Sequence, residues 1–162
     1  MARPKIKPKD ITKLDSVANP LINDNFIIKA HLRTDHQFKN NKGKSPQITY
    51  EDEQATKVYV NAEHRKVIAS LNPGAKSLFI HILYELDWGK DYIWINKARF
   101  MDENNMLDER TFNAAIEELC NRPEPEQPII TPSTLNGVYW INPRLFFCGS
   151  RLDKYPKNVD IK

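Results

Sequence analysis

Apolar residues recur at helical spacing in the stretch from about residue 73 to residue 87. Leu78 and Ile82 lie four positions apart, with further apolar residues beside them on the same face. Asn72 and Pro73 precede them, and Asn-Pro is a common start because proline is well tolerated at the first helical position. The pattern therefore predicts a buried helix over 73–87.

The same spacing returns twice further along the chain. A second helix is predicted over about 97–104, and a third runs from a cap at Asp108 to about Asn121. Phe112 and Leu119 belong to one apolar stripe on this third helix. The turn between these two helices is short.

Between and after these helices the pattern changes to short β-branched and aromatic runs. Residues 91–96, 129–131 and 138–142 are such runs and predict strands. Asn136-Gly137 separates the last two and indicates a hairpin, because both central residues of the favoured tight turn have positive φ. The preceding residues 132–135 predict a connecting loop longer than two residues. A shorter helix, capped by Asn61, is predicted before residue 70.

The order of the predicted elements is typical of one fold class. Helix, strand, helix, short turn, helix, strand, hairpin turn and strand is the order of a winged helix-turn-helix domain. We therefore expect an α+β fold with three helices and a three-stranded antiparallel sheet whose hairpin forms the wing. Residues 57–162 would form this domain with a C-terminal extension, and residues 1–56 an extended, partly ordered N-terminal arm.

A short phrase occurs twice, as Trp94-Ile-Asn96 and as Trp140-Ile-Asn142. In each copy a phenylalanine follows the asparagine by four positions, which is the spacing of a hydrophobic staple around a helix N-cap. We interpret both copies as points where a strand ends and a helix begins. The two strands would be the first and third of one sheet, with Trp94 and Trp140 near each other on one face.

Charge is distributed unevenly along the 162 residues. Residues 1–50 contain ten Lys and Arg against four Asp and Glu, a net of +6, whereas the whole chain has a net charge of only +3. Basic arms are attracted to nucleic acid without sequence preference, although a solvated tail has the same composition. No apolar run reaches the length that spans a bilayer, so we expect no membrane association.

Candidate chemistry is sparse. His31 and His36 lie close together in sequence, but no cysteine or second cluster completes a metal site. His81 sits among apolar residues, where a partly buried histidine with a satisfied partner is the usual outcome. No glycine-rich phosphate loop and no nucleophile motif is present. We therefore expect no metal, no cofactor and no enzymatic activity.

Binding remains, and in a helix-turn-helix the second helix of the motif reads base edges with its first residues. Arginine pairs with guanine and asparagine with adenine in the major groove, whereas lysines and other arginines contact phosphates. Acidic Glu117 and Glu118 favour contact by the first turn only. An ordinary polar helix face is the alternative interpretation. The predicted DNA contacts are Arg110, Thr111 and Asn113 on the recognition helix, Lys97 and Arg99 before it, Asn136 in the wing, and Arg144, Arg151, Lys154 and Lys157 after it.

The second half of the chain resembles plasmid and phage replication proteins of the RepL type. The runs that carry the resemblance are 91–96, 100–105, 110–119 and 138–151, of which Ile-Asn-Pro followed by Phe-Phe, Gly and Arg is the most specific. The resemblance covers roughly residues 57–158. It implies a winged-helix protein that binds double-stranded DNA in replication initiation and has no enzymatic activity.

Two rivals stay open at this point. One is a structural or adaptor protein of a phage particle or replisome, whose arm binds replication or virion proteins and buries Phe26, Ile27 and Ile28 against another chain. The other is a transcription regulator, which shares the fold. We expect the protein in the bacterial cytoplasm, or associated with the virion in the adaptor version. Pairing as a homodimer on two half-sites is compatible with the fold, although no heptad repeat is visible.

Overall fold

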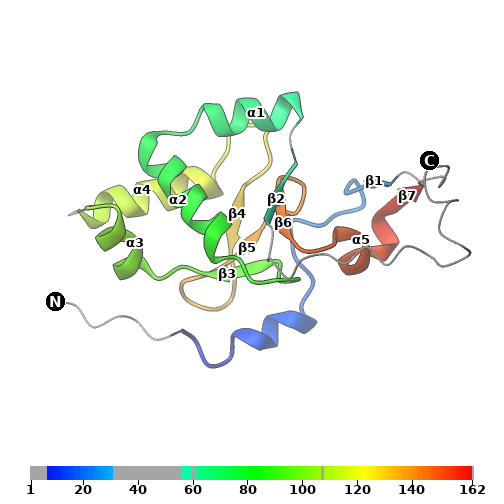
Figure 1. Ribbon diagram of the computed structural model, residues 1–162, viewed down its shortest axis with the longest axis horizontal. Helices are drawn as coiled ribbons and strands as arrows, with labels where there is room; N and C mark the ends of the chain where they lie inside the picture. Colours follow the sequence, from blue (N-terminus) through cyan, green and yellow to red (C-terminus); the bar gives the residue numbers. More distant parts are fainter. Residues whose placement is uncertain (1–6, 31–55, 60, 107, 162) are drawn as a thin grey trace, which may run out of the picture.

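The computed structural model describes residues 7–30, 56–59, 61–106 and 108–161. Within these residues, short helices pack on small sheets, so the α+β class is confirmed (Figure 1). The predictions for His31 and His36 lie outside the described residues.

The helices predicted over 61–70, 73–87, 97–104 and 108–121 form to within about two residues of those bounds, whereas the short helical elements at 11–16, 151–154 and 156–158 were not predicted. Asn61, Asn96 and Asp108 are N-caps, and their side-chain oxygens accept backbone N–H groups at 2.8, 3.2 and 2.8 Å, respectively. Each such cap stabilises its helix by about 1 kcal/mol. The helical elements are α1 (Ala62–Ala69), α2 (Pro73–Glu85), α3 (Lys97–Glu103), α4 (Glu109–Cys120) and α5 (Arg151–Lys154), with the 3-10 turns η1 (Ile11–Ser16) and η2 (Pro156–Asn158).

The strands form three small sheets. The largest is antiparallel with the order β3–β5–β4, so the first and third predicted strands do pair directly. An antiparallel pair, β2–β6, and a parallel pair, β1–β7, complete the described strands. Their bounds are β1 (Ile28–Ala30), β2 (Thr56–Val58), β3 (Tyr92–Trp94), β4 (Ile130–Pro132), β5 (Val138–Ile141), β6 (Phe146–Cys148) and β7 (Val159–Ile161).

The hairpin between β4 and β5 is confirmed, but its turn differs from the expected one. Gly137 has a φ of 76°, whereas Asn136 is not among the residues with positive φ. The N–H of Val138 donates to the carbonyl of Leu135 at 3.1 Å, which closes a turn around Asn136 and Gly137. Only the second central residue needs positive φ in a type II turn, and glycine supplies it here. The longer loop removes the need for a left-handed asparagine.

The first copy of the repeated phrase behaves as predicted. Ile95 and Phe100 flank the Asn96 cap, and both are buried in the core. Trp94 and Trp140 lie on the same face of the sheet, because Trp140 is opposite Tyr92 and Trp94 is opposite Val138.

The second copy departs from the prediction, since no helix starts at residue 143. Asn142 opens a single turn, in which its side chain accepts the N–H of Arg144 at 3.1 Å, and the chain then enters β6. Residues 146–148 form a strand and not a helix because they pair with β2, where Phe146 lies opposite Val58 and Cys148 opposite Thr56.

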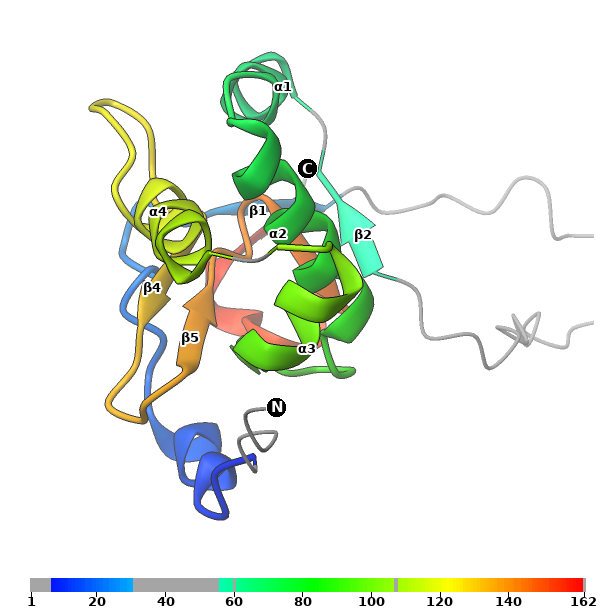
Figure 2. The same ribbon diagram turned by 90° about the vertical axis from the view of Figure 1, so that its left-hand side faces the viewer.

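The core occupies the space between the helices and one face of the main sheet. Its fully buried side chains include Leu78 from α2, Phe100 from α3, Leu119 from α4 and Phe146 from β6. Burying side chains of this size contributes about 1.5–3 kcal/mol each. Figure 2 shows α2 and α3 to the right of β4 and β5, α4 at the upper end of β4, and η1 below the strands.

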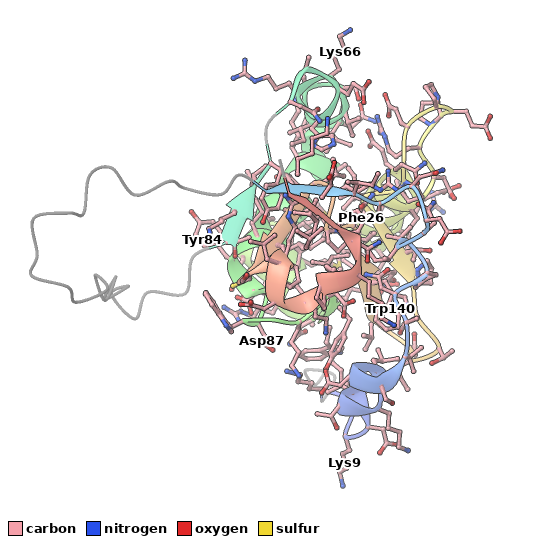
Figure 3. All side chains as sticks on the ribbon, turned by 90° about the vertical axis from the view of Figure 1, so that its right-hand side faces the viewer. Lys9, Phe26, Lys66, Tyr84, Asp87 and Trp140 are labelled. Atoms are coloured by element: carbon pink, nitrogen blue, oxygen red, sulfur yellow. The ribbon has the colours of Figure 1, made fainter. Side chains whose placement is uncertain are left out.

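The N-terminal segment covers the opposite face of the sheet. Ile11 and Leu14 of η1 pack with Tyr92, Val138 and Trp140 in a second, smaller cluster. Residues 7–30, which the sequence assigns to an arm, are therefore in contact with the helical domain over part of their length (Figure 3).

The adaptor hypothesis for Phe26 and Ile28 needs correction. Both side chains are buried within the same chain, at 2% and 4% exposure, and Phe26 packs edge-to-face on Tyr155. Ile27 remains exposed, since alternate residues of this segment face opposite ways.

Candidate nucleic-acid interface

Helix α4 presents a polar face to solvent from its first turn onward. Phe112, Ala115 and Leu119 are buried and hold the helix against α2, while Arg110, Asn113 and Glu117 on the other side are exposed. The Asp108 side chain accepts the N–H of Arg110 at 2.8 Å and fixes where the helix begins. The direction in which Arg110 and Asn113 leave the surface is thus set by a rigid element.

Arg110 is an exposed cation on the first turn of α4. Its guanidinium has no ion pair or side-chain hydrogen bond among the residues that the structure describes. Thr111 is also exposed, and its methyl carbon lies 3.6 Å from the position that a Cβ on Gly74 would occupy. Thr111 therefore borders the start of α2, with Asn113 and Arg110 further out on α4.

Lys97 and Arg99 are committed to carboxylates of their own chain. Lys97 lies 2.9 Å from Glu109 and above the ring of Phe112, with its side chain only 23% exposed. Arg99 bridges Glu103 at 2.7 Å and Glu85 at 3.1 Å. The hydrogen bond from Arg99 lowers the pKa of Glu103, so this carboxylate stays charged. Neither cation offers an unpaired charge to a phosphate.

Arg144 and Arg151, predicted as phosphate contacts, instead fasten the C-terminal third to the rest of the fold. Arg144 donates to Asn23 at 2.7 Å, and its Nε is buried without a hydrogen-bond partner among the described residues. Arg151 donates to the carbonyl of Pro143 at 3.0 Å and stacks 3.3 Å above the ring of Tyr59. Burial lowers the pKa of Arg151 from its ordinary value.

Lys154 is also directed inward. Its ammonium lies 3.7 Å from Asp91, a carboxylate with a side chain only 5% exposed. The hydroxyl of Tyr155 donates to the same carboxylate at 2.8 Å. Lys154 thus helps to compensate a buried charge, which is costly when it is left unpaired.

The remaining two predicted contacts are exposed but lie apart from each other. Asn136 is at the tip of the β4–β5 loop, whereas Lys157 is in η2. In Figure 1, α4 is at one end of the molecule and the region of α5 and β7 is at the other. The structure thus does not bring Lys157 to the first turn of α4.

Glu118 has a role that the sequence interpretation missed. Its carboxylate accepts the N–H of Asn72 at 2.9 Å and the Asn72 side-chain amide at 3.1 Å. It therefore satisfies the start of α2 from a neighbouring helix. The i,i+4 spacing to Arg122, 3.9 Å away, indicates an ion pair along α4 but gives no sign of the contact with Asn72.

A hollow of about 360 Å³ lies between α2 and α3. Ile80 and Tyr84 line it from α2, and Arg99 and Glu103 from α3. The buried His81 also lines it, with Nδ1 3.5 Å from Glu103, so this histidine has the partner that the sequence led us to expect. Desolvation lowers the pKa of His81, although the nearby Glu85 and Glu103 oppose this.

Further candidate sites are not seen among the described residues. No three His, Cys, Asp or Glu side chains gather there in a way that would hold a metal ion. Within the same ranges, no helix is both long enough and apolar enough to cross a bilayer. Cys120 and Cys148 are free thiols.

No protein-family model matches the chain, and no curated protein or solved structure is similar enough to count as a match.

Proposed function

We propose that α2, α3, α4 and the β3–β5–β4 sheet form a winged helix that binds double-stranded DNA. In this assignment α3 and α4 are the two helices of the motif, α4 is the recognition helix, and the loop between β4 and β5 is the wing. The element order and the direct pairing of β3 with β5 support it.

The observation that carries the proposal is the exposed first turn of α4. Arg110 and Asn113 are the side chains that can pair with guanine and adenine edges, and both project from a helix held by the core. Two carboxylates lie at this N-terminus and limit its attraction for phosphate. Asp108 accepts the N–H of Arg110 at 2.8 Å, and Glu109 is paired with Lys97 at 2.9 Å, so the readout is assigned to the side chains and not to the backbone N–H groups.

The acidic part of α4 limits how the helix can approach a duplex. Glu117 is exposed two turns after Arg110 and would be repelled by phosphates. We infer that the helix enters the groove with its first turn only. Because most other predicted cations are paired within the chain, few phosphates are neutralised, and the salt dependence is shallower than the basic composition suggests.

Replication initiation is the role that the RepL resemblance implies, and it is part of this proposal. The transcription-regulator alternative has the same interface and differs in the DNA site that is bound. A reporter driven by the DNA flanking the gene, together with a plasmid-maintenance assay, distinguishes the two.

The direct test is a salt-varied titration of fluorescent duplexes from the DNA that flanks the gene. Arg110→Ala is expected to weaken binding to the preferred duplex by about 1–3 kcal/mol and to reduce discrimination against substituted sites. Lys157→Ala is the matched control, because this exposed cation lies at the other end of the molecule. The variant should bind the duplex with the same affinity as the unmodified protein.

Absence of duplex binding by the unmodified protein at low salt contradicts the proposal. Equal effects of Arg110→Ala and Lys157→Ala would mean that α4 is not the element that reads the sequence.

A further inference from the structure

The solvent-facing side of α2 carries apolar residues that do nothing for the core. Ile80 and Tyr84 lie one turn apart and are 52% and 85% exposed, and Trp88 just beyond the helix is 55% exposed. The opposite side of the same helix already supplies Leu78 and Ile82 to the core. Figure 3 shows Tyr84 at the outer surface of the molecule.

A knob and a hollow occur side by side on this surface. Tyr84 is the most exposed large apolar side chain of the described residues, and it borders the 360 Å³ hollow between α2 and α3. The hollow is lined by the apolar side chain of Ile80 and by the polar side chains of Arg99 and Glu103. This lining can bind a tyrosine side chain, which combines an apolar ring with a polar hydroxyl. Tyrosine and tryptophan are also the residues that most often dominate protein interfaces.

We propose that a second copy of this chain occupies this surface, with the two α2 helices antiparallel across a two-fold axis. A two-fold interface uses the same patch twice, so a patch that carries both a knob and a hollow can complement itself. Tyr84 of each copy enters the hollow of the other and packs on Ile80.

The charges along α2 favour the antiparallel direction. Lys76 lies one turn before Ile80, and Asp87 lies at the far end of the helix. An axis between Ile80 and Tyr84 sets Lys76 of one copy near Asp87 of the other, whereas a parallel arrangement brings like charges together. Asp87 can take part, since its present partner Lys7 is 3.6 Å away and both side chains are more than half exposed.

Sedimentation equilibrium of the full chain without DNA tests the proposal, so its outcome is separate from that of the DNA titration. The unmodified protein is expected to show a concentration-dependent monomer–dimer equilibrium. Tyr84→Glu should raise the dimer dissociation constant by about tenfold or more. Because Tyr84 is exposed, the monomer should keep its circular dichroism spectrum and Tm.

Two further variants identify the surface and its direction. Leu152→Glu is the matched control, since Leu152 is an exposed apolar residue on α5, and it should leave the equilibrium unchanged. Lys76→Glu should weaken the dimer, and Lys76→Glu combined with Asp87→Lys should restore it.

A chain that stays monomeric at all concentrations overturns the proposal, and so does a dimer that Tyr84→Glu does not weaken. Monomers that bind a different protein through Tyr84 would also overturn it. Failure of the double charge exchange to restore association excludes the antiparallel arrangement.

Discussion

At the scale of single residues, the predicted cationic contacts differ in whether they already have a partner within the chain. The sequence indicates which residues are charged, but it does not show that Arg151 stacks on Tyr59 or that Lys154 faces Asp91. Tyr59 and Asp91 are distant in sequence from Arg151 and Lys154, so no local sequence pattern predicts these contacts. The exposure of Arg110 and Asn113 was predictable because helical periodicity places them opposite Phe112 and Leu119, whereas their contact with DNA stays a prediction.

Arg151 gives a prediction at this scale. Arg151→Ala is expected to lower the free energy of unfolding by about 1–3 kcal/mol, because it removes a stacked guanidinium and a hydrogen bond to a main-chain carbonyl. Arg151→Lys should recover little of this, since an ammonium cannot stack in the same way. Urea denaturation measures the change. A variant with unaltered stability but weaker DNA binding would return Arg151 to the interface.

At the scale of elements, the four longer helices were predictable, whereas the pairing of strands in the two smaller sheets was not. Caps and apolar spacing are local signals, and they placed α2, α3 and α4 closely. The residues after Asn142 have the local spacing of a capped helix, but they form strand β6 because pairing with β2 is more favourable. Tertiary pairing of this kind cannot be deduced from spacing within one segment.

The two asparagines of the repeated phrase should therefore differ in importance. Asn96→Ala removes a helix cap from a half-buried position and should cost about 0.5–2 kcal/mol. Asn142 is fully buried and donates to the carbonyl of Pro128 at 2.7 Å, so Asn142→Ala leaves buried groups unsatisfied and should cost more, about 2–4 kcal/mol. Chemical denaturation of both variants under one set of conditions gives the comparison. Equal costs would contradict the distinction.

At the scale of the whole molecule, the N-terminal segment acts as a strap across the sheet. Asn19 is buried and donates to the carbonyl of Ile141 at 2.9 Å, while Asn158 donates to that of Phe26 at 2.9 Å. Composition led us to expect an arm, because prolines and basic residues dominate it. The few apolar and amide groups that attach it to the domain are too scattered to form a periodic pattern.

Phe26→Ala is expected to loosen this strap. The ring is almost fully buried against Tyr155, and removal of such a side chain costs about 3–5 kcal/mol where the cavity cannot collapse. Limited proteolysis should then cut faster between residues 7 and 30, and backbone amides of β7 should exchange faster with deuterium. Ile27→Ala, at the exposed neighbour, serves as the control and should change neither rate.

The parallel pairing of β1 with β7 has a consequence for how the protein is made. Ile28 lies opposite Val159, so β1 has no partner until the chain has been synthesised as far as β7. Phe26 likewise has no partner until Tyr155 has been synthesised. On the ribosome, α2, α3, α4 and the main sheet emerge complete while the strap is still uncovered. A chain that stops before α5 would keep its helical core but leave Phe26 and Ile28 without their C-terminal partners. These exposed apolar side chains are what chaperones and proteases would recognise in a truncated product.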